Sequence, residues 1–134
     1  MKTIFEIGDK KEFEKLVTEK DTASFDSGTV HPVYATFALG RDAEWCCRLF
    51  VLAMKEADEE GIGTALSIQH HSPALLGETV KFTAWVYSQE KNNITCKYEA
   101  KVGERIVASG EQGQKILKKD RLEKLFNNIS SANP

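Results

Sequence analysis

The sequence lacks a long hydrophobic run, an excess of charge and a paired set of cysteines. Its longest uninterrupted apolar run, Leu49–Met54, is far shorter than the roughly 18–20 residues that cross a bilayer. A formal net charge of −2 gives no electrostatic reason to expect binding to nucleic acid or to an anionic membrane. Three cysteines, two of them adjacent and none in a Cys-x-x-Cys pair, make no disulfide framework. We therefore expect a cytoplasmic, reducing setting and no nucleic-acid or membrane partner.

What the sequence does contain is ordinary for a globular chain. Its 134 residues are 41% hydrophobic and 28% charged, without an internal repeat or a low-complexity segment. A chain of this size can bury about two-thirds of its unfolded surface in one core. We expect a single domain spanning residues 1–134.

One segment predicts a long, largely buried helix. From Phe37 to Met54, thirteen of eighteen positions are apolar, which is too many for a helix with only one covered side. The acidic stretch that follows, with Gly61 and Gly63, predicts the end of the helix. Such a helix must be covered on most sides by other parts of the chain.

The rest of the chain predicts antiparallel sheet. Between Val80 and Val86 apolar residues alternate with Lys81, Thr83 and Trp85, which is the period of a strand with one buried face. The predicted strands are Thr3–Ile7, Val33–Ala35, Thr64–His71, Glu78–Glu90, Ile94–Val102 and Arg105–Leu117, with a charged, solvated segment over Gly8–Pro32 and a terminal helix over Lys119–Ile129. Gly110 and Gly113 predict a bulge or strong curvature in the last strand. The sum is an α+β domain of the hot-dog kind, a curved antiparallel sheet wrapped around one long helix.

Three polar residues lie where they could carry chemistry. Thr36 ends the short strand before the helix, Glu44 lies about two turns into the helix, and His70 ends the strand after it. They supply a hydroxyl to orient a partner, a carboxylate to act as base or nucleophile, and an imidazole to donate a hydrogen bond. Backbone N–H groups at the helix start can hold a carbonyl oxygen as negative charge develops. Acyl transfer uses these parts.

Other interpretations of the same residues stay open on pattern alone. Arg41 and Arg48 lie at helical spacing from Glu44, so an exposed ion-pair stripe that continues to Lys55 is an alternative. Thr36 could be a simple helix cap.

His70 also has a structural interpretation. His71 follows it, and neighbouring strand residues face opposite ways, so one of the two is expected to point inward and the other outward. The same geometry disfavours a His-His metal site, and we predict no metal. Cys46 and Cys47 lie among apolar helix residues and are interpreted as core fillers.

A family resemblance adds to this pattern. The stretches "VYATFALGRDAEWCCRLFVLAM" and "GTALSIQHHSPALLGETVKFTAWV" resemble the hot-dog thioesterases of the fluoroacetyl-CoA thioesterase group. The shared features are an Ala-Thr before the helix, a Glu-Trp pair inside it, a Gly-Thr-Ala strand ending in histidine, and a Gly-x-x-Val start to the following hairpin. The resemblance covers roughly residues 33–86, and more loosely the strands to Leu117.

The resemblance implies an acyl-CoA thioesterase with Thr36, Glu44 and His70 as its catalytic set and Gly77 near the bound thioester. In this interpretation His70 polarises the thioester carbonyl, Glu44 attacks it or activates water, and Thr36 orients the carboxylate or the substrate. The resemblance further implies a homodimer whose sheets join edge to edge, with acyl-CoA near the interface and no metal or redox cofactor. Dimers could pair further into tetramers. Arg41 and Arg48 become candidates for holding the carboxylate or contacting CoA phosphates.

Two other functions remain possible for such a scaffold. One is a non-catalytic dimer that binds acyl-CoA or another small ligand, since one fold hosts several functions. The other is a hot-dog hydratase, for which Asp42 near the helix start is the remaining candidate. The group's aromatic gate has no clear counterpart here, so the resemblance implies no particular acyl group.

Overall fold

The computed structural model describes residues 1–25 and 28–132. Along the chain the elements are β1 (Lys10–Leu16), the 3-10 turn η1 (Glu19–Asp21), β2 (Thr22–Phe25), β3 (Gly28–Tyr34), α1 (Thr36–Met54), β4 (Glu59–Leu66), β5 (Gln69–His70), β6 (Thr79–Glu90), β7 (Asn93–Val102), β8 (Arg105–Lys118) and α2 (Lys119–Ala132).

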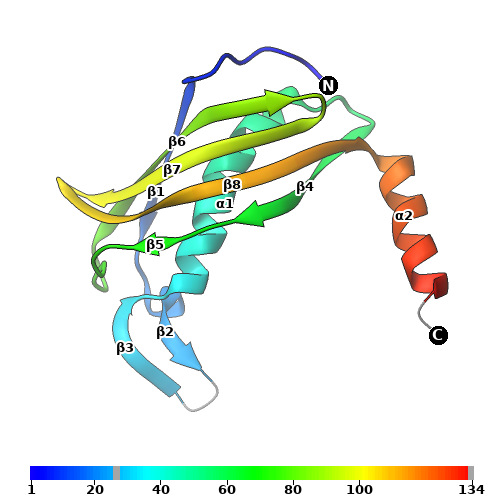
Figure 1. Cartoon of the computed structure of the whole chain (residues 1–134). Coiled ribbons are helices and arrows are strands. Elements are labelled where there is room, and N and C mark those ends of the chain that lie inside the picture. Colours follow the sequence, from blue (N-terminus) through cyan, green and yellow to red (C-terminus); the bar gives the residue numbers. More distant parts are fainter. Residues whose placement is uncertain (26–27, 133–134) are drawn as a thin grey trace.

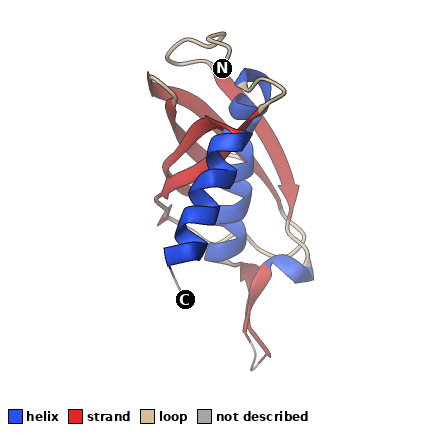
Figure 2. Ribbon diagram, turned by 90° about the vertical axis from the view of Figure 1, so that its right-hand side faces the viewer, coloured by secondary structure: helices blue, strands red, loops and turns tan. Residues whose placement is uncertain are grey.

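The main sheet curls around α1, as Figure 1 shows. Its strand order is β1-β6-β7-β8-β4, and the short β5 pairs with β8 beyond the end of β4. Every pairing is antiparallel. The strands β2 and β3 form a separate hairpin that projects from the lower end of the molecule in Figure 2. The predicted α+β hot-dog arrangement is confirmed.

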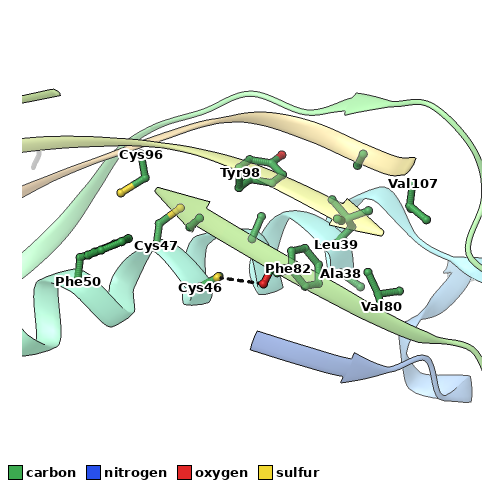
Figure 3. Packing of buried hydrophobic residues seen from close by; sticks show 14 of the residues in the cluster. Ala38, Leu39, Cys46, Cys47, Phe50, Val80, Phe82, Cys96, Tyr98 and Val107 are labelled. Atoms are coloured by element: carbon green, nitrogen blue, oxygen red, sulfur yellow. Dashed lines mark hydrogen bonds between the residues drawn. The ribbon is translucent and has the colours of Figure 1, made fainter. Parts of the chain in front are cut away.

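The sheet closes around α1 because both surfaces are apolar where they meet. Ten of the nineteen residues of α1 are buried, and β6 and β7 bury alternate side chains. Phe82 and Tyr98, from neighbouring strands, lie over the helix beside Leu39 in Figure 3. Full burial of each such side chain contributes about 1.5–3 kcal/mol. No helix within the described residues is long and apolar enough to span a membrane.

The N-terminal segment differs from its prediction. Residues 3–7 form no strand, and Phe5 instead packs edge-on against Phe50 with ring centroids 4.9 Å apart. The segment predicted to be solvated contains β1, which pairs with β6 along its whole length and turns Phe13 toward Phe82. The pattern was missed because β1 has charged residues at most positions and occupies a sheet edge, where alternation needs few apolar residues.

The strand predicted over Thr64–His71 is broken in two. It begins earlier, at Glu59, and is interrupted between β4 and β5. The register slips once at Thr64, between Gly63 and Ala65. A Cβ at Gly110 would overlap the carbonyl oxygen of Ser67, so this glycine admits a close approach of the segment that joins β4 to β5. The bulge predicted at the β8 glycines lies instead on the paired strand, at Thr64 of β4 beside Gly113, and the register slip of β8 itself lies at Val107.

The terminal helix forms where it was predicted and extends slightly further. It follows β8 directly, and the backbone N–H of Lys119 donates to the carbonyl of Asp58 at 2.8 Å. Leu122 is buried against the body, whereas Leu125, Phe126 and Ile129 are exposed.

Candidate active site

Thr36 and His70 meet at the start of α1. The hydroxyl oxygen of Thr36 lies 3.3 Å from Nδ1 of His70, which brings together the first residue of the helix and the last residue of β5. The N-cap is Ala35, which has no side-chain acceptor, so Thr36 does not serve as the cap. The interpretation of Thr36 as a simple cap is wrong, because its hydroxyl faces the histidine.

The electrostatic surroundings favour a neutral His70. Partial burial lowers the pKa of His70 below its ordinary value, and the charge of His71 lowers it further. His71 itself contacts Ser109, with Nε2 and the hydroxyl oxygen 2.9 Å apart. Both histidines are exposed, so the expectation that one of them points into the core is wrong. A neutral imidazole can accept at one ring nitrogen and donate from the other.

A cavity of about 380 Å³ opens beside this pair. Its walls come from β3, the start of α1 and the segment after β5. It is lined by Ala23, His31, Val33, Tyr34, Ala35, Thr36, His70, His71, Ser72 and Pro73. This volume lies within the usual range for small-molecule sites, and the walls are mainly apolar with a few polar groups. The positive end of the α1 dipole also lies at this cavity.

A larger hollow, of about 650 Å³, lies over β1, β6 and β7. Lys10, Lys81, Glu12 and Glu99 are among its lining residues, and neither Thr36 nor His70 is. Its lining includes no histidine and no helix N-terminus, so the smaller cavity is the better candidate for acyl chemistry.

Glu44 is half-buried, and its partner is an amide. The Nε2 atom of Gln112, on β8, donates to Oε1 of Glu44 at 3.2 Å. The alternative of an exposed ion-pair stripe is wrong. Arg48 instead donates to Glu60 at 2.7 Å, and no described cationic side chain pairs with Glu44.

Glu44 does not join Thr36 and His70 within one chain. Eight residues of continuous helix separate Thr36 from Glu44, and at 1.5 Å per residue this is about 12 Å along the axis. One small carbonyl group cannot contact both ends of that span.

The predicted substrate-binding residues lie in three different settings. Arg41 forms a fork of two hydrogen bonds to Asp42, each 3.1 Å, and a third to Asp21 at 3.0 Å. Arg48 lies on the same helix and pairs with Glu60. Gly77 has φ +88° in the turn before β6, a conformation that favours glycine, and its N–H donates to Val17. None of the three lines the cavity, and their roles toward substrate stay predictions.

Asp42 is occupied by structural partners. It is buried, and besides Arg41 it accepts a hydrogen bond from the hydroxyl of Tyr34. Burial and this hydrogen bond raise the pKa of Tyr34 above its ordinary value, so the hydroxyl remains a donor. A hydratase needs an acidic group open to substrate, and the position of Asp42 does not offer one.

Cys46 and Cys47 are core residues, as predicted, and Cys96 joins them. Cys46, Cys47 and Cys96 are free and buried, and Figure 3 shows them between α1 and the sheet. Burial raises the pKa of Cys46 to about 12, which makes it a poor nucleophile. Within the described residues no group of three or more His, Cys, Asp or Glu side chains could hold a metal ion. The absence of a cofactor stays a prediction.

Sequence reasoning missed Gln112, Gln114 and the role of Gly63. A Cβ on Gly63 would overlap Oε1 of Glu44, so only glycine leaves room for this carboxylate. The sequence feature that could have identified them is the presence of two glutamines at alternate positions of a strand predicted to pack against the helix. On an inward face, two neutral polar residues need a partner, and Glu44 is that partner.

Comparison with known proteins identifies the family of the chain. Residues 17–120 match the family described as "FlK: Fluoroacetyl-CoA-specific thioesterase". The chain belongs to this family. Membership confirms the predicted class, a thioester hydrolase. No curated protein matches the sequence.

Solved structures support the same assignment. A hypothetical protein of Thermus thermophilus, described as a thioesterase superfamily member, is 32% identical with a TM-score of 0.91, over 97% of this chain and 96% of that one. The fluoroacetyl-CoA thioesterase FlK is 23% identical with a TM-score of 0.84, over 97% and 98% of the two chains. A hot-dog-like protein of Thermanaerovibrio acidaminovorans is 22% identical with a TM-score of 0.85, over 93% of each. The last two show likeness of fold.

Proposed function

We propose that this family member hydrolyses acyl-CoA thioesters at a site that two copies of the chain build together. The observation that carries the proposal is the Thr36–His70 pair at the start of α1, beside an apolar cavity, in a chain of a thioesterase family. A variant of FlK has been solved in complex with fluoroacetate and CoA, so a relative of the same fold accommodates both parts of such a substrate.

His70 polarises the thioester carbonyl. With the Thr36 hydroxyl donating to Nδ1, the proton of the neutral imidazole lies on Nε2, which donates to the carbonyl oxygen. The backbone N–H groups and the dipole at the start of α1 add to the stabilisation of that oxygen as it becomes negative. Thr36 thus sets the tautomer of the histidine.

Glu44 supplies the base. It takes a proton from water as the water oxygen bonds to the carbonyl carbon, the carbon–sulfur bond then breaks, and the proton passes to the departing CoA sulfur. Alternatively, the carboxylate attacks the carbonyl carbon itself, the carbon–sulfur bond breaks to release CoA as the thiolate, which takes up a proton, and water hydrolyses the resulting anhydride. Single-turnover hydrolysis in ¹⁸O-labelled water tests the second route, because only an anhydride opened by water at the carboxyl carbon of Glu44 leaves label in this residue.

The length of α1 supports a site in which Glu44 comes from the second copy. Glu44 lies about 12 Å along the helix from Thr36, so one chain cannot place both at the same carbonyl. Two antiparallel helices related by two-fold symmetry bring the start of one beside the middle of the other. Each site then takes Thr36 and His70 from one chain and Glu44 from its partner.

The surface of the chain supports this pairing. β4 is the last strand of the sheet order, and its residues from Gly63 to Leu66 are exposed, which leaves an edge that a second copy can extend. At 100° per residue, Phe37, Trp45 and Leu52 lie within about 80° of one another on α1. Their exposed fractions are 58%, 42% and 40%.

Glu44 lies on this same face of α1, and so does Arg48. A partner that covers the apolar side chains therefore also covers the carboxylate. In the pair, Arg48 and Arg41 lie near the shared surface, where we place contacts to CoA phosphates, with Gly77 closer to the acyl end. The reaction needs only the thioester and water.

A complementation experiment tests both the chemistry and the pairing. Glu44→Gln and His70→Ala are each expected to lower thioester hydrolysis by about a hundredfold or more across a panel of acyl-CoA substrates, measured by release of free thiol. When the two inactive variants are co-expressed, each mixed dimer that forms has one intact site. A random mixture of subunits should recover about a quarter of the wild-type rate, since half the dimers are mixed and half of their sites are intact.

The outcomes separate the alternatives. No recovery, with both variants folded and dimeric, would show that each site lies within one chain. A wild type that hydrolyses no thioester yet binds acyl-CoA would instead establish a binding protein. Light scattering on the same samples distinguishes dimers from tetramers.

A further inference from the structure

The inner face of β8 carries two glutamines among the apolar residues of the core. Gln112 is 2% exposed and Gln114 is 3% exposed, and Ile116 continues the same face of the strand. Burying an amide is unfavourable unless its hydrogen bonds are made inside the protein. Two adjacent buried amides therefore require hydrogen-bond partners inside the protein.

Those partners form a chain that ends at Glu44. Nε2 of Gln114 donates to Oε1 of Gln112 at 3.0 Å, and Nε2 of Gln112 donates to Oε1 of Glu44 at 3.2 Å. The second hydrogen of the Gln112 amide goes to the carbonyl of Gly113 at 3.0 Å. An ionised carboxylate only accepts, so the nitrogen of Gln112 must face Glu44 and its oxygen must face Gln114. Flipping the Gln112 amide would break all three bonds.

Gly63 holds the carboxylate from the other side. A side chain at this position would overlap Oε1 of Glu44, whereas glycine lets the carboxylate lie against β4. Oε1 is thus fixed between Gly63 and Gln112. No described residue donates to Oε2, which leaves that oxygen for water or the substrate.

The hydrogen-bond donor to Glu44 is a neutral amide, and this affects how well the carboxylate can act as a base. Arg48 lies one helical turn after Glu44 and could pair with it, but Glu60 holds Arg48 at 2.7 Å. An amide orients the carboxylate without adding a full positive charge beside it, and a positive charge would stabilise the carboxylate and weaken it as a proton acceptor.

We propose that Gln112 and Gln114 are positioning residues, an amide relay that fixes the Glu44 carboxylate for catalysis while keeping it free of a cation. The inference rests on the proposed function of Glu44. Its direct member is Gln112, and Gln114 acts only through Gln112. Removing Gln112 leaves Glu44 in place but free to rotate, which lowers turnover more than substrate binding.

The test is a mutant cycle measured on one acyl-CoA substrate that the wild type hydrolyses. Gln112→Leu is expected to lower kcat by about ten- to a hundredfold with KM changed by less than about threefold, and Gln114→Leu to lower kcat by about three- to tenfold. Ile116→Val is the matched control on the same face of the strand, and it should leave kcat unchanged. Thermal unfolding of each variant shows that it is folded at the assay temperature.

The decisive step combines Gln112→Leu with Glu44→Gln. If Gln112 acts through Glu44, the double variant is no slower than Glu44→Gln alone, because the group that Gln112 orients is already gone. A further loss as large as in the wild-type background would show a purely structural role and overturn the relay. So would a kcat of Gln112→Leu within about twofold of wild type.

Failure of the proposed function looks different. In that case Glu44→Gln itself keeps the wild-type rate, or the wild type hydrolyses no thioester, and the relay loses its catalytic role as well. If Glu44→Gln is inactive while Gln112→Leu is fully active, only the relay is wrong.

Discussion

Asp42 and Glu44 are two carboxylates two residues apart on α1, and they have opposite surroundings. Two residues turn a helix by about 200°, so the side chains leave on opposite sides. Asp42 points into the molecule, where the Tyr34 hydroxyl and the fork of Arg41 satisfy it. Arg41 then links it to Asp21, which ties α1 to η1.

Glu44 points toward the face that the chain leaves exposed. Its hydrogen-bond donor is the neutral Gln112, and the nearest arginine on the helix is bound elsewhere. The comparison teaches that a buried carboxylate with a cation and several donors stabilises the fold. A carboxylate that is held at one oxygen and lacks a cation is available for proton transfer.

The largest expected effect on stability comes from the structural carboxylate. Asp42→Asn removes the charge and leaves one acceptor oxygen where Tyr34 and Arg41 use two, with an amide N–H group turned toward one of these donors. We expect a loss of about 2–3 kcal/mol in the free energy of unfolding, discounted because Arg41 is largely exposed. Glu44→Gln should change stability by less than about 0.5 kcal/mol, because Gln112 can still donate to the new amide oxygen. Urea titration of both variants measures the contrast, and equal losses would remove the distinction.

Gly63→Ala should have the next largest effect, and it acts on the Glu44 carboxylate. The added methyl group overlaps Oε1 of Glu44 and forces the side chain to another rotamer, so we expect kcat to fall about ten- to a hundredfold. Gly61→Ala is the control, because its methyl group collides first with the apolar side chain of Val51 and next, at 3.2 Å, with Oε1 of Gln114, whereas Glu44 is not among its three nearest contacts. The control should lower the melting temperature more than the rate. The opposite pattern would contradict the role assigned to Gly63.

Freeing Arg48 from its ion pair with Glu60 should give Glu44 a cationic partner, as Asp42 has in Arg41. Glu60→Gln weakens the 2.7 Å ion pair, and the freed guanidinium can reach the carboxylate one turn before it on the helix. We expect kcat to fall about three- to tenfold. Adding Arg48→Gln to Glu60→Gln should restore kcat, while KM rises because the proposed contact of Arg48 to the CoA phosphates is lost. A double variant that stays slow would show that Glu60 acts in another way.

The smallest expected effect concerns the histidine pair. The charge of His71 contributes to lowering the pKa of His70, after the larger contribution of burial. His71→Gln removes that charge, so the pKa of His70 should rise toward its ordinary value and the imidazole should protonate at higher pH. NMR titration of the His70 ring protons in both proteins measures this shift. An unchanged midpoint would leave burial as the whole cause.

Some of these features follow from local pattern and others do not. The alternation from Val80 to Val86 and the apolar stretch before Met54 are periodic, so the sheet and the helix could be predicted. The N-terminal strand could not, because the large apolar residues of β1 are Phe13 and the exposed Leu16, and this alternation is too sparse. The break between β4 and β5 depends on the close approach of Ser67 to Gly110, which lie far apart in the sequence.

The sequence by itself predicted the fold class, because the hydrophobic period is a local property of the chain, and its resemblance to a family made Thr36, Glu44 and His70 the candidate site residues. Only the tertiary structure decided which of these residues meet. It joined Thr36 to His70 across thirty-four positions and held Glu44 two turns away. It also paired Arg41 with Asp42 and Arg48 with Glu60, and it brought the amide of Gln112 within hydrogen-bonding distance of Glu44. The physical reason is that each polar side chain near the core pairs with whatever donor or acceptor the closing sheet brings within reach, and that choice depends on geometry between distant segments.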